Sequence, residues 1–418
     1  MPAGRSVARP PIRRSHRPVP NAATGPEAFV SQPTRHNHFV PQHYLRAWSA
    51  DGHRVWSYAT LVPHANCPEW ELRSTRGLAA HDHLYTARLG PGDADRFERR
   101  LHAEIEQPAE AVIAKMAAGR ALDRADFARL ARYAFVLNLR TPVAYGEYAA
   151  RAARIGPDLL HRTLTRAVST LERAARRGDA GQVRTRRGTR PDAHPMPTRV
   201  RVDAGAPDRP ATLGATFVVG RAAWLHSLER LLGPHSRSAR AAEACHWRII
   251  RPFPGRTWWT SDHPVVRLNY YGEQDGVDRY DFGGGWGNPG SEILVPLTPD
   301  HLLYAQVGAG QRRDPAERRG ARRGRRRRPA SEAAAVIRHD DVASAWFTTM
   351  VQRFVAERAH RWVFASEAAG RVRWFRPRHV NADQWRGERE SWQRWDAEHS
   401  AAESELADPG SAEARVPT

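Results

Sequence analysis

The densest group of side chains able to do chemistry lies between residues 36 and 48, where the sequence reads HNHFVPQHYLRAW. His38 is the first candidate catalytic residue, because a histidine can serve as a general base or a metal ligand near neutral pH. It could equally cap the helix that follows it or bond a backbone carbonyl. Gln42 is a candidate ligand-binding side chain, and its alternative role is to bond backbone groups at the turn.

A second candidate group, Thr260-Ser261-Asp262, follows residues that are typical of a β-strand. Active sites of α/β and α+β proteins often take their carboxylates from strand ends, so Asp262 is the second candidate catalytic residue. Ser261, beside it, is a candidate ligand-binding hydroxyl. The alternative for Asp262 is an Asx-type turn, in which the carboxylate bonds the backbone two residues on.

Arg140 is the third candidate, as a ligand-binding residue. A guanidinium can clamp a carboxylate or a phosphate through two parallel hydrogen bonds. It can also cap the C-terminus of its own helix, where positive charge is favourable. If His38 and Asp262 form one site, we expect their side chains within about 8 Å of each other and Arg140 in the same cavity.

The elements that must position these residues follow from hydrophobic periodicity. Proline excludes the helical region for the residue before it, so Val40-Pro41 predicts a strand at 36–40 and a helix at 42–48. Apolar residues at helical spacing predict helices at 97–116, 124–141 and 144–175. Apolar and β-branched runs predict strands at 247–250, 265–268, 293–297, 302–305 and 362–365. Strands after helices without regular alternation favour an α+β fold, with a mixed or antiparallel central sheet packed against the helical middle section.

The net charge of +20 suggests a nucleic-acid partner, but its distribution weakens that interpretation. All of the excess lies in three segments, residues 1–35, 150–212 and 310–330, which leaves the rest of the chain nearly neutral. We expect an Arg- and Pro-rich disordered tail at 1–35 and disordered inserts at 176–212 and 310–330. The Arg-rich inserts allow non-specific nucleic-acid binding. The run in the last insert lacks interleaved aromatic residues, which favours a solvated insert.

The remaining organisation is one domain at 36–375 and a polar tail at 376–418 with a short helix. Cys67 and Cys245 are isolated in the sequence, which argues against structural zinc and a disulfide framework. No apolar run approaches the length that spans a bilayer, so we expect a cytoplasmic protein that does not bind membranes. The glycine cluster at 283–287 fits neither a phosphate-binding nor a dinucleotide pattern, and no cofactor is assigned.

Residues 38–46, HFVPQHYLR, resemble the opening motif of the bacterial domain-of-unknown-function 4238 family. Further stretches fit in order: Leu84-Tyr85-Thr86, Leu139-Arg140-Thr141-Pro142, and Thr260-Ser261-Asp262-x-Pro264 followed by Pro296-Leu297-Thr298-Pro299. The resemblance covers roughly residues 36 to 366. It implies no reaction, because that family has no agreed activity. His43 and His263 depart from the usual pattern, which makes them poor catalytic candidates.

The sequence supports two functions. One is a pocket of enzyme type built from His38, Gln42, Arg140 and Asp262, hydrolytic and acting on a phosphorylated or nucleic-acid substrate. The other is a non-catalytic binding module, in which the same residues fasten the N-terminal hairpin to the central sheet. A water-filled pocket would favour the enzyme, and a dry, fully bonded cluster would favour the binding module.

Overall fold

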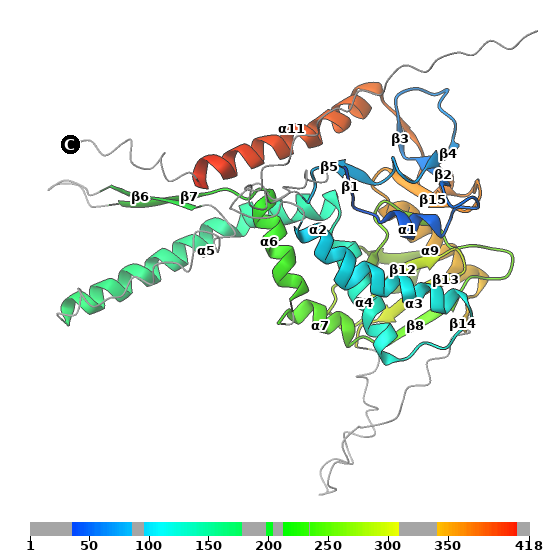
Figure 1. Cartoon of the computed structure of the whole chain (residues 1–418), viewed down its shortest axis with the longest axis horizontal. Coiled ribbons are helices and arrows are strands. Elements are labelled where there is room, and N and C mark those ends of the chain that lie inside the picture. Colours follow the sequence, from blue (N-terminus) through cyan, green and yellow to red (C-terminus); the bar gives the residue numbers. More distant parts are fainter. Residues whose placement is uncertain are drawn as a thin grey trace, which may run out of the picture. The chain divides into compact units, whose positions relative to one another are not determined.

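The computed structural model describes residues 36–85, 96–177, 198–203, 212–233, 235–308 and 341–407 (Figure 1). The chain divides after Pro33, and all of these residues belong to the second unit, Thr34–Thr418. The expected tail at 1–35 and the Arg-rich insert at 310–330 therefore lie outside the described residues.

The helical middle section begins with one continuous run from Arg96 to Ala117. It consists of α2 (Arg96–Leu101), the π-helical segment η1 (His102–Glu106) and α3 (Gln107–Ala117). Pro108 has no N–H to offer the carbonyl four residues earlier, and the widened turn lies just before it.

Two further helices complete this section, α4 (Arg124–Leu139) and α5 (Pro142–Arg176). Asp123 begins α4 with a capping box, in which it and Asp126 each bond the other's backbone N–H.

A six-stranded sheet runs in the order β11-β10-β12-β13-β8-β14. Its strands are β8 (Trp247–Arg251), β10 (Val266–Gln274), β11 (Val277–Asp281), β12 (Ser291–Thr298), β13 (His301–Gln306) and β14 (Asp341–Val342). All neighbours are antiparallel except β14 and β8.

Helices cover both faces of this sheet. Ile293 and Val295 of β12 join the hydrophobic cluster that contains α4, whereas Leu294 joins the cluster that contains α9 (Ala345–Arg358). Alternate side chains of one strand thus enter two cores, which explains why residues 293–297 read as an unbroken apolar run.

A four-stranded antiparallel sheet, in the order β4-β2-β15-β9, carries the residues around Asp262. Its strands are β2 (Arg54–Ala59), β4 (Trp70–Ser74), β9 (Thr260–Ser261) and β15 (Trp362–Ala365). Two small pairs accompany it, β1 (His36–His38) with β5 (Ala80–Asp82) and β3 (Leu61–Val62) with β16 (His379–Val380). Helix α1 (Gln42–Arg46) follows β1. Helices and mixed or antiparallel sheets of this kind confirm the α+β class.

The segment at 176–212 differs from expectation. Thr198–Asp203 forms β6 and pairs with β7 (Thr212–Phe217), so the prediction of disorder is wrong for β6. Val200 and Val202 alternate with arginines, a strand pattern that the charge of the segment obscured. Residues 178–197 and 204–211 of this segment lie outside the described residues.

The polar C-terminal region contains a longer helix than expected, α11 (Ala382–Ala407), of 26 residues. It packs on α6 (Arg221–Leu232), which α7 (Arg237–Glu243) follows. A buried ion pair joins Arg221 to Asp396, and the Trp395 ring lies 4.8 Å from that of Tyr145. These contacts across the chain, which local sequence does not reveal, stabilise the helix. In the part of the chain that the structure describes, no helix has the length and apolarity needed to cross a membrane.

Candidate functional site

His38 lies on the β1–β5 ribbon, opposite Ala80. Side chains alternate along a strand, so His36 and His38 project from the same face. Nε2 of each ring lies near the carbonyl oxygen of Arg76, at 3.2 Å for His36 and 3.1 Å for His38. A carbonyl only accepts, so Nε2 of His38 carries the proton of its ring, whereas His36 also contacts a carboxylate oxygen of Asp82 through Nδ1, at 3.1 Å. Burial lowers the pKa of His38, which leaves its ring neutral near pH 7 with Nδ1 as the basic atom.

Gln42 approaches that basic atom from the first turn of α1. Its Nε2 lies 3.5 Å from Nδ1 of His38, and its Oε1 accepts a hydrogen bond from Arg46 at 3.2 Å. A separation of 3.5 Å is at the long limit for a hydrogen bond. A substrate atom could therefore replace Gln42 at Nδ1 at small cost.

Asp262 follows β9 and is only 3% exposed. Its Oδ1 accepts the backbone N–H of His360 at 2.9 Å, and its Oδ2 accepts that of Arg361 at 2.8 Å. Burial raises the pKa of Asp262, while the charge of His360 and the backbone donors oppose that rise. The carboxylate thus holds the connection between α9 and β15, about a hundred residues away in sequence. It does not make the Asx turn that was its local alternative.

Ser261 makes the local turn instead. Its hydroxyl donates to the carbonyl of His263 at 2.9 Å and accepts the backbone N–H of His263 at 3.1 Å. The residue is fully buried. Its proton is used within the bend before Pro264. Burial also lowers the pKa of the neighbouring His263 to about 3, so that ring stays neutral.

Arg140 follows α4 directly and is 3% exposed. Its Nε donates to the hydroxyl of Tyr85 at 3.1 Å, and one terminal nitrogen donates to the carbonyl of His38 at 2.6 Å. The other terminal nitrogen forms an ion pair with Glu106. Each of the three nitrogens thus has a partner inside the protein, and the side chain is buried, which favours the structural role of Arg140 over anion binding.

We call Arg140, Glu106, Tyr85 and the carbonyl of His38 the Arg140 brace. Burial would raise the pKa of Glu106, but the charge of Arg140 holds it below its ordinary value. Tyr85 closes the group by donating to the carbonyl of Arg140 at 2.7 Å. The brace joins the end of α4 to η1 and β1. Glu106 was missed in the sequence because nothing in the spacing of 34 residues signals a pair with Arg140.

The hydrogen bonds of the described residues do not join His38 to Asp262. Strand alternation places His81 on the face of the β1–β5 ribbon opposite to His38. Burial, and then the charges of His360 and Arg361, lower the pKa of His81 to about 4. Asp262 bonds the backbone of those two residues. The two residues whose backbone Asp262 bonds thus act electrostatically on His81, which lies on the ribbon face from which the His38 imidazole does not project.

The buried residues of α1 connect the stretches on which the family resemblance depends. The Tyr44 hydroxyl bonds Oγ1 of Thr260 at 2.7 Å and donates to the carbonyl of Pro296 at 2.5 Å. Nε1 of Trp48 donates to the carbonyl of Trp258 at 2.8 Å. Helix α1 is thus fastened to β9 and β12. Tyr44 and Trp48 are both buried, and nothing in the sequence alone indicates these polar contacts.

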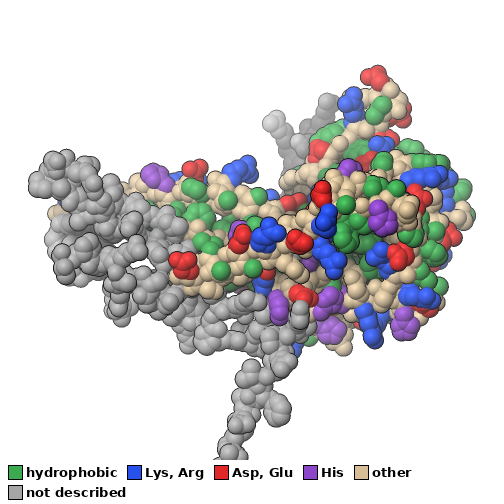
Figure 2. Space-filling model, turned by 90° about the horizontal axis from the view of Figure 1, so that it is seen from above, with side chains coloured by type: hydrophobic (Ala, Val, Ile, Leu, Met, Phe, Trp, Pro, Cys, Tyr) green, Lys and Arg blue, Asp and Glu red, His purple; other side chains and the backbone are tan. Residues whose placement is uncertain are grey.

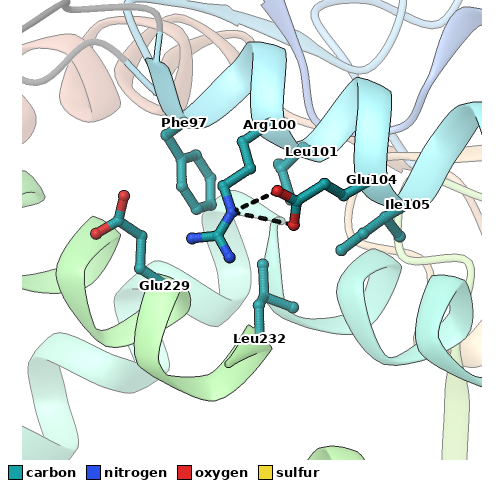
Figure 3. A pocket seen from close by; sticks show the side chains of 7 residues that line it. All are labelled: Phe97, Arg100, Leu101, Glu104, Ile105, Glu229 and Leu232. Atoms are coloured by element: carbon teal, nitrogen blue, oxygen red, sulfur yellow. Dashed lines mark hydrogen bonds and ion pairs between the residues drawn. The ribbon is translucent and has the colours of Figure 1, made fainter. Parts of the chain in front are cut away.

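The pocket drawn in Figure 3 lies elsewhere, between the α2–η1 run and α6. Its lining residues are Phe97, Arg100, Leu101, Glu104, Ile105, Glu229 and Leu232. Nε of Arg100 bonds both carboxylate oxygens of Glu104 at 3.1 Å. None of the predicted site residues lines this pocket. Within the described ranges, no three His, Cys, Asp or Glu side chains are arranged to hold a metal ion.

The chain belongs to the family described as "Protein of unknown function (DUF4238)", whose profile matches residues 36–369. The match confirms the resemblance carried by the four sequence stretches. Neither the curated proteins nor the solved structures that were compared with the chain gave a match.

Proposed function

We propose that the chain is a non-catalytic binding module of the cytoplasm, in which the residues of the family pattern are structural. One observation carries this proposal. Asp262 is buried, and each of its carboxylate oxygens already accepts a backbone N–H. A general base or nucleophile needs an atom that the substrate can reach, and these bonds occupy both oxygens.

The Arg140 brace supports the same proposal. A guanidinium that binds a ligand anion must present unused donors to it. Arg140 instead neutralises Glu106 inside the protein. The free thiols Cys67 and Cys245 agree with a reducing compartment such as the cytoplasm.

A hydrolase acting on a phosphorylated or nucleic-acid substrate is the second candidate function. One observation favours it. Nδ1 of His38 is basic and belongs to a ring that is neutral at pH 7. Its contact with Gln42 is long, at 3.5 Å, and therefore weak. In that function His38 alone would take a proton from water or from a substrate hydroxyl.

Two variants, His38→Ala and Asp262→Ala, separate these functions. Each is compared with the wild type by urea unfolding and in a panel of nuclease and phosphatase assays with divalent metal ions present. The Asp262→Ala variant loses the two hydrogen bonds that backbone N–H groups donate to the carboxylate, so we expect its free energy of unfolding to fall by about 2–4 kcal/mol. For His38→Ala we expect the free energy of unfolding to fall by less than about 1 kcal/mol.

The control is Asp300→Ala, which removes an exposed carboxylate just after β12. The proposal requires that no turnover depends on His38 or Asp262. Turnover by the wild type that disappears in a stably folded His38 or Asp262 variant would establish the hydrolase instead.

The face of the molecule in Figure 2 bears on where a partner could bind. Basic, acidic and hydrophobic side chains are interspersed over its described part. On this face, a binding surface must therefore be sought as a local group of side chains rather than as a broad field of one sign.

A further inference from the structure

A large aromatic side chain stands exposed on α10 (Val372–Phe375), between β15 and β16. Trp374 is 68% exposed, whereas Val372 on the same turn is fully buried. The Phe375 ring lies 6.2 Å from that of Trp259 in the core. Two hydrophobic neighbours thus hold the turn in place while the indole remains in solvent. A rigidly presented, exposed indole is a common feature of binding surfaces.

Arginines flank this indole on both sides in sequence. Arg371 and Arg373 are exposed and Arg376 is half-buried. Among the described residues, none of these three side chains has an acidic partner or a hydrogen-bond acceptor. Arg378 differs, because its guanidinium donates to the carbonyls of Cys67 and Pro68 at 2.5 and 2.9 Å. One arginine of the segment is therefore structural, and the other three form no ion pair among the described residues.

These charges also lie close together in space. The Tyr58 hydroxyl donates to the carbonyl of Arg376 at 2.7 Å. Burial and the negative charge of Glu69 raise the pKa of that hydroxyl to about 12, while the positive charges of Arg378, Arg373 and Arg376 oppose the rise. Three guanidinium groups and one carboxylate therefore lie within electrostatic range of the Tyr58 hydroxyl, and Arg373 and Arg376 belong to the same turn as the exposed indole.

We propose that Arg371, Arg373, Trp374 and Arg376, the α10 surface, bind single-stranded nucleic acid. A base stacks on the exposed indole, and the three unpaired guanidinium groups contact successive phosphates. Proteins that bind single strands usually combine these two contacts: bases stack on aromatic side chains, and basic side chains contact the phosphate backbone. Stacking tolerates any base, so the surface selects unpaired strands rather than a sequence.

Other polyanions fit the surface less well. A helix that lies in a membrane interface presents an apolar stripe along its length. Helix α10 has four residues and exposes one aromatic side chain, which gives it no such stripe. An acidic protein surface would pair with the arginines and could cover the indole too, so the dependence of binding on the bases of the strand decides between the two partners.

The test measures binding of a twelve-residue oligo(dT), the corresponding oligo(U) and an abasic oligonucleotide of equal length to the full chain. Trp374→Ala should weaken binding of the first two by about tenfold or more. It should leave the abasic strand unaffected, because that strand keeps its phosphates and has no base to stack. Trp346→Ala is the matched control, since Trp346 is also exposed, at 53%, and the described residues around it in sequence, 341–352, contain no arginine. Comparing the affinities for oligo(U) and oligo(dT) shows whether the surface prefers RNA or DNA.

Salt dependence tests the arginines separately. The double variant Arg371→Gln/Arg373→Gln should reduce the slope of log affinity against log salt by about 1.4, at roughly 0.7 for each phosphate contact on a single strand. The control is Arg237→Gln/Arg240→Gln, which removes two exposed charges from α7. It should reduce neither the affinity for oligo(dT) nor the difference between oligo(dT) and the abasic strand.

The proposal is overturned if the Trp374 and Trp346 variants bind oligo(dT) equally well. It is also overturned if Trp374→Ala abolishes binding to vesicles containing phosphatidylserine while leaving oligonucleotide binding intact, which would assign the surface to membranes. Circular dichroism confirms that each variant is folded. This inference names a partner for the binding module proposed above. It depends on the α10 surface alone, so its failure would leave the assignments of Asp262 and Arg140 untouched.

Discussion

Removing the carboxylate of Glu106 should expose how much the fold depends on the Arg140 brace. Glu106 is 8% exposed and Arg140 is 3% exposed, so neither charge can be solvated when the other is lost. Breaking a buried ion pair by removing one partner typically costs about 3–5 kcal/mol. Arg140 would keep its bonds to Tyr85 and to the His38 carbonyl. We therefore expect Glu106→Ala to lower the free energy of unfolding by about 3 kcal/mol.

The assay is urea unfolding followed by circular dichroism, with a double-mutant cycle to isolate the pair. Arg140→Met keeps the apolar stem and removes the charge. If the two groups depend on each other, the double variant should cost about 2–3 kcal/mol less than the sum of the single variants. Glu104→Ala is the matched control. It lies on the same π-helical segment, but its side chain is 51% exposed, and its pair with Arg100 should contribute at most about 1 kcal/mol.

A pH series gives an independent check with a defined sign. The pKa of Glu106 lies below its ordinary value of 4.5 in the folded chain, because Arg140 overcomes the effect of burial. The stability that this carboxylate contributes is therefore fully present above about pH 4.5 and is lost as the pH falls through the lower, folded value. Glu106→Gln should lack this part of the acid response. If Glu106→Ala lowers the free energy of unfolding no more than Glu104→Ala does, the ion pair between Arg140 and Glu106 does not stabilise the fold, and its structural role is refuted.

Three further outcomes follow from individual contacts. Tyr44→Phe removes the hydroxyl that bonds Thr260 and Pro296, and urea unfolding should show a loss of about 1–3 kcal/mol. His263 has a pKa of about 3 when folded, so stability should fall by about 1.4 kcal/mol per pH unit below pH 6.5, and His263→Asn should flatten that slope in a pH series of melting curves. Asp123→Ala breaks the capping box of α4 and should cost about 1 kcal/mol by urea unfolding, with unchanged stability contradicting the cap.

Local sequence was sufficient for the elements whose pattern is local. The start of α4 at Asp123 follows from a capping residue and the apolar positions after it. The strands at 293–297 and 302–305 follow from short apolar runs bounded by polar residues. Hydrophobic periodicity and caps act over a few residues, so a single sequence displays them in full.

The candidate site was less predictable because its contacts are not local. Asp262 bonds the backbone of His360 and Arg361, and a backbone N–H has no sequence signature. Arg140 meets Glu106 only because η1 and the end of α4 pack together. Residue type therefore singled out polar groups that form hydrogen bonds within the fold, but it could not say whether each one faced a ligand or another part of the chain.

The stretches that identify the family meet inside the protein. Tyr44 of the opening stretch bonds Thr260 and Pro296, which both belong to the fourth stretch, while Arg140 of the third stretch bonds the backbone of His38. Buried polar groups need partners, and an unmade bond there costs more than a made one contributes. A set of mutually bonded residues is thus constrained by folding alone, whatever the protein binds. The family pattern then specifies the fold, and a partner is to be sought on exposed groups such as the α10 surface, where folding imposes no such constraint on Trp374.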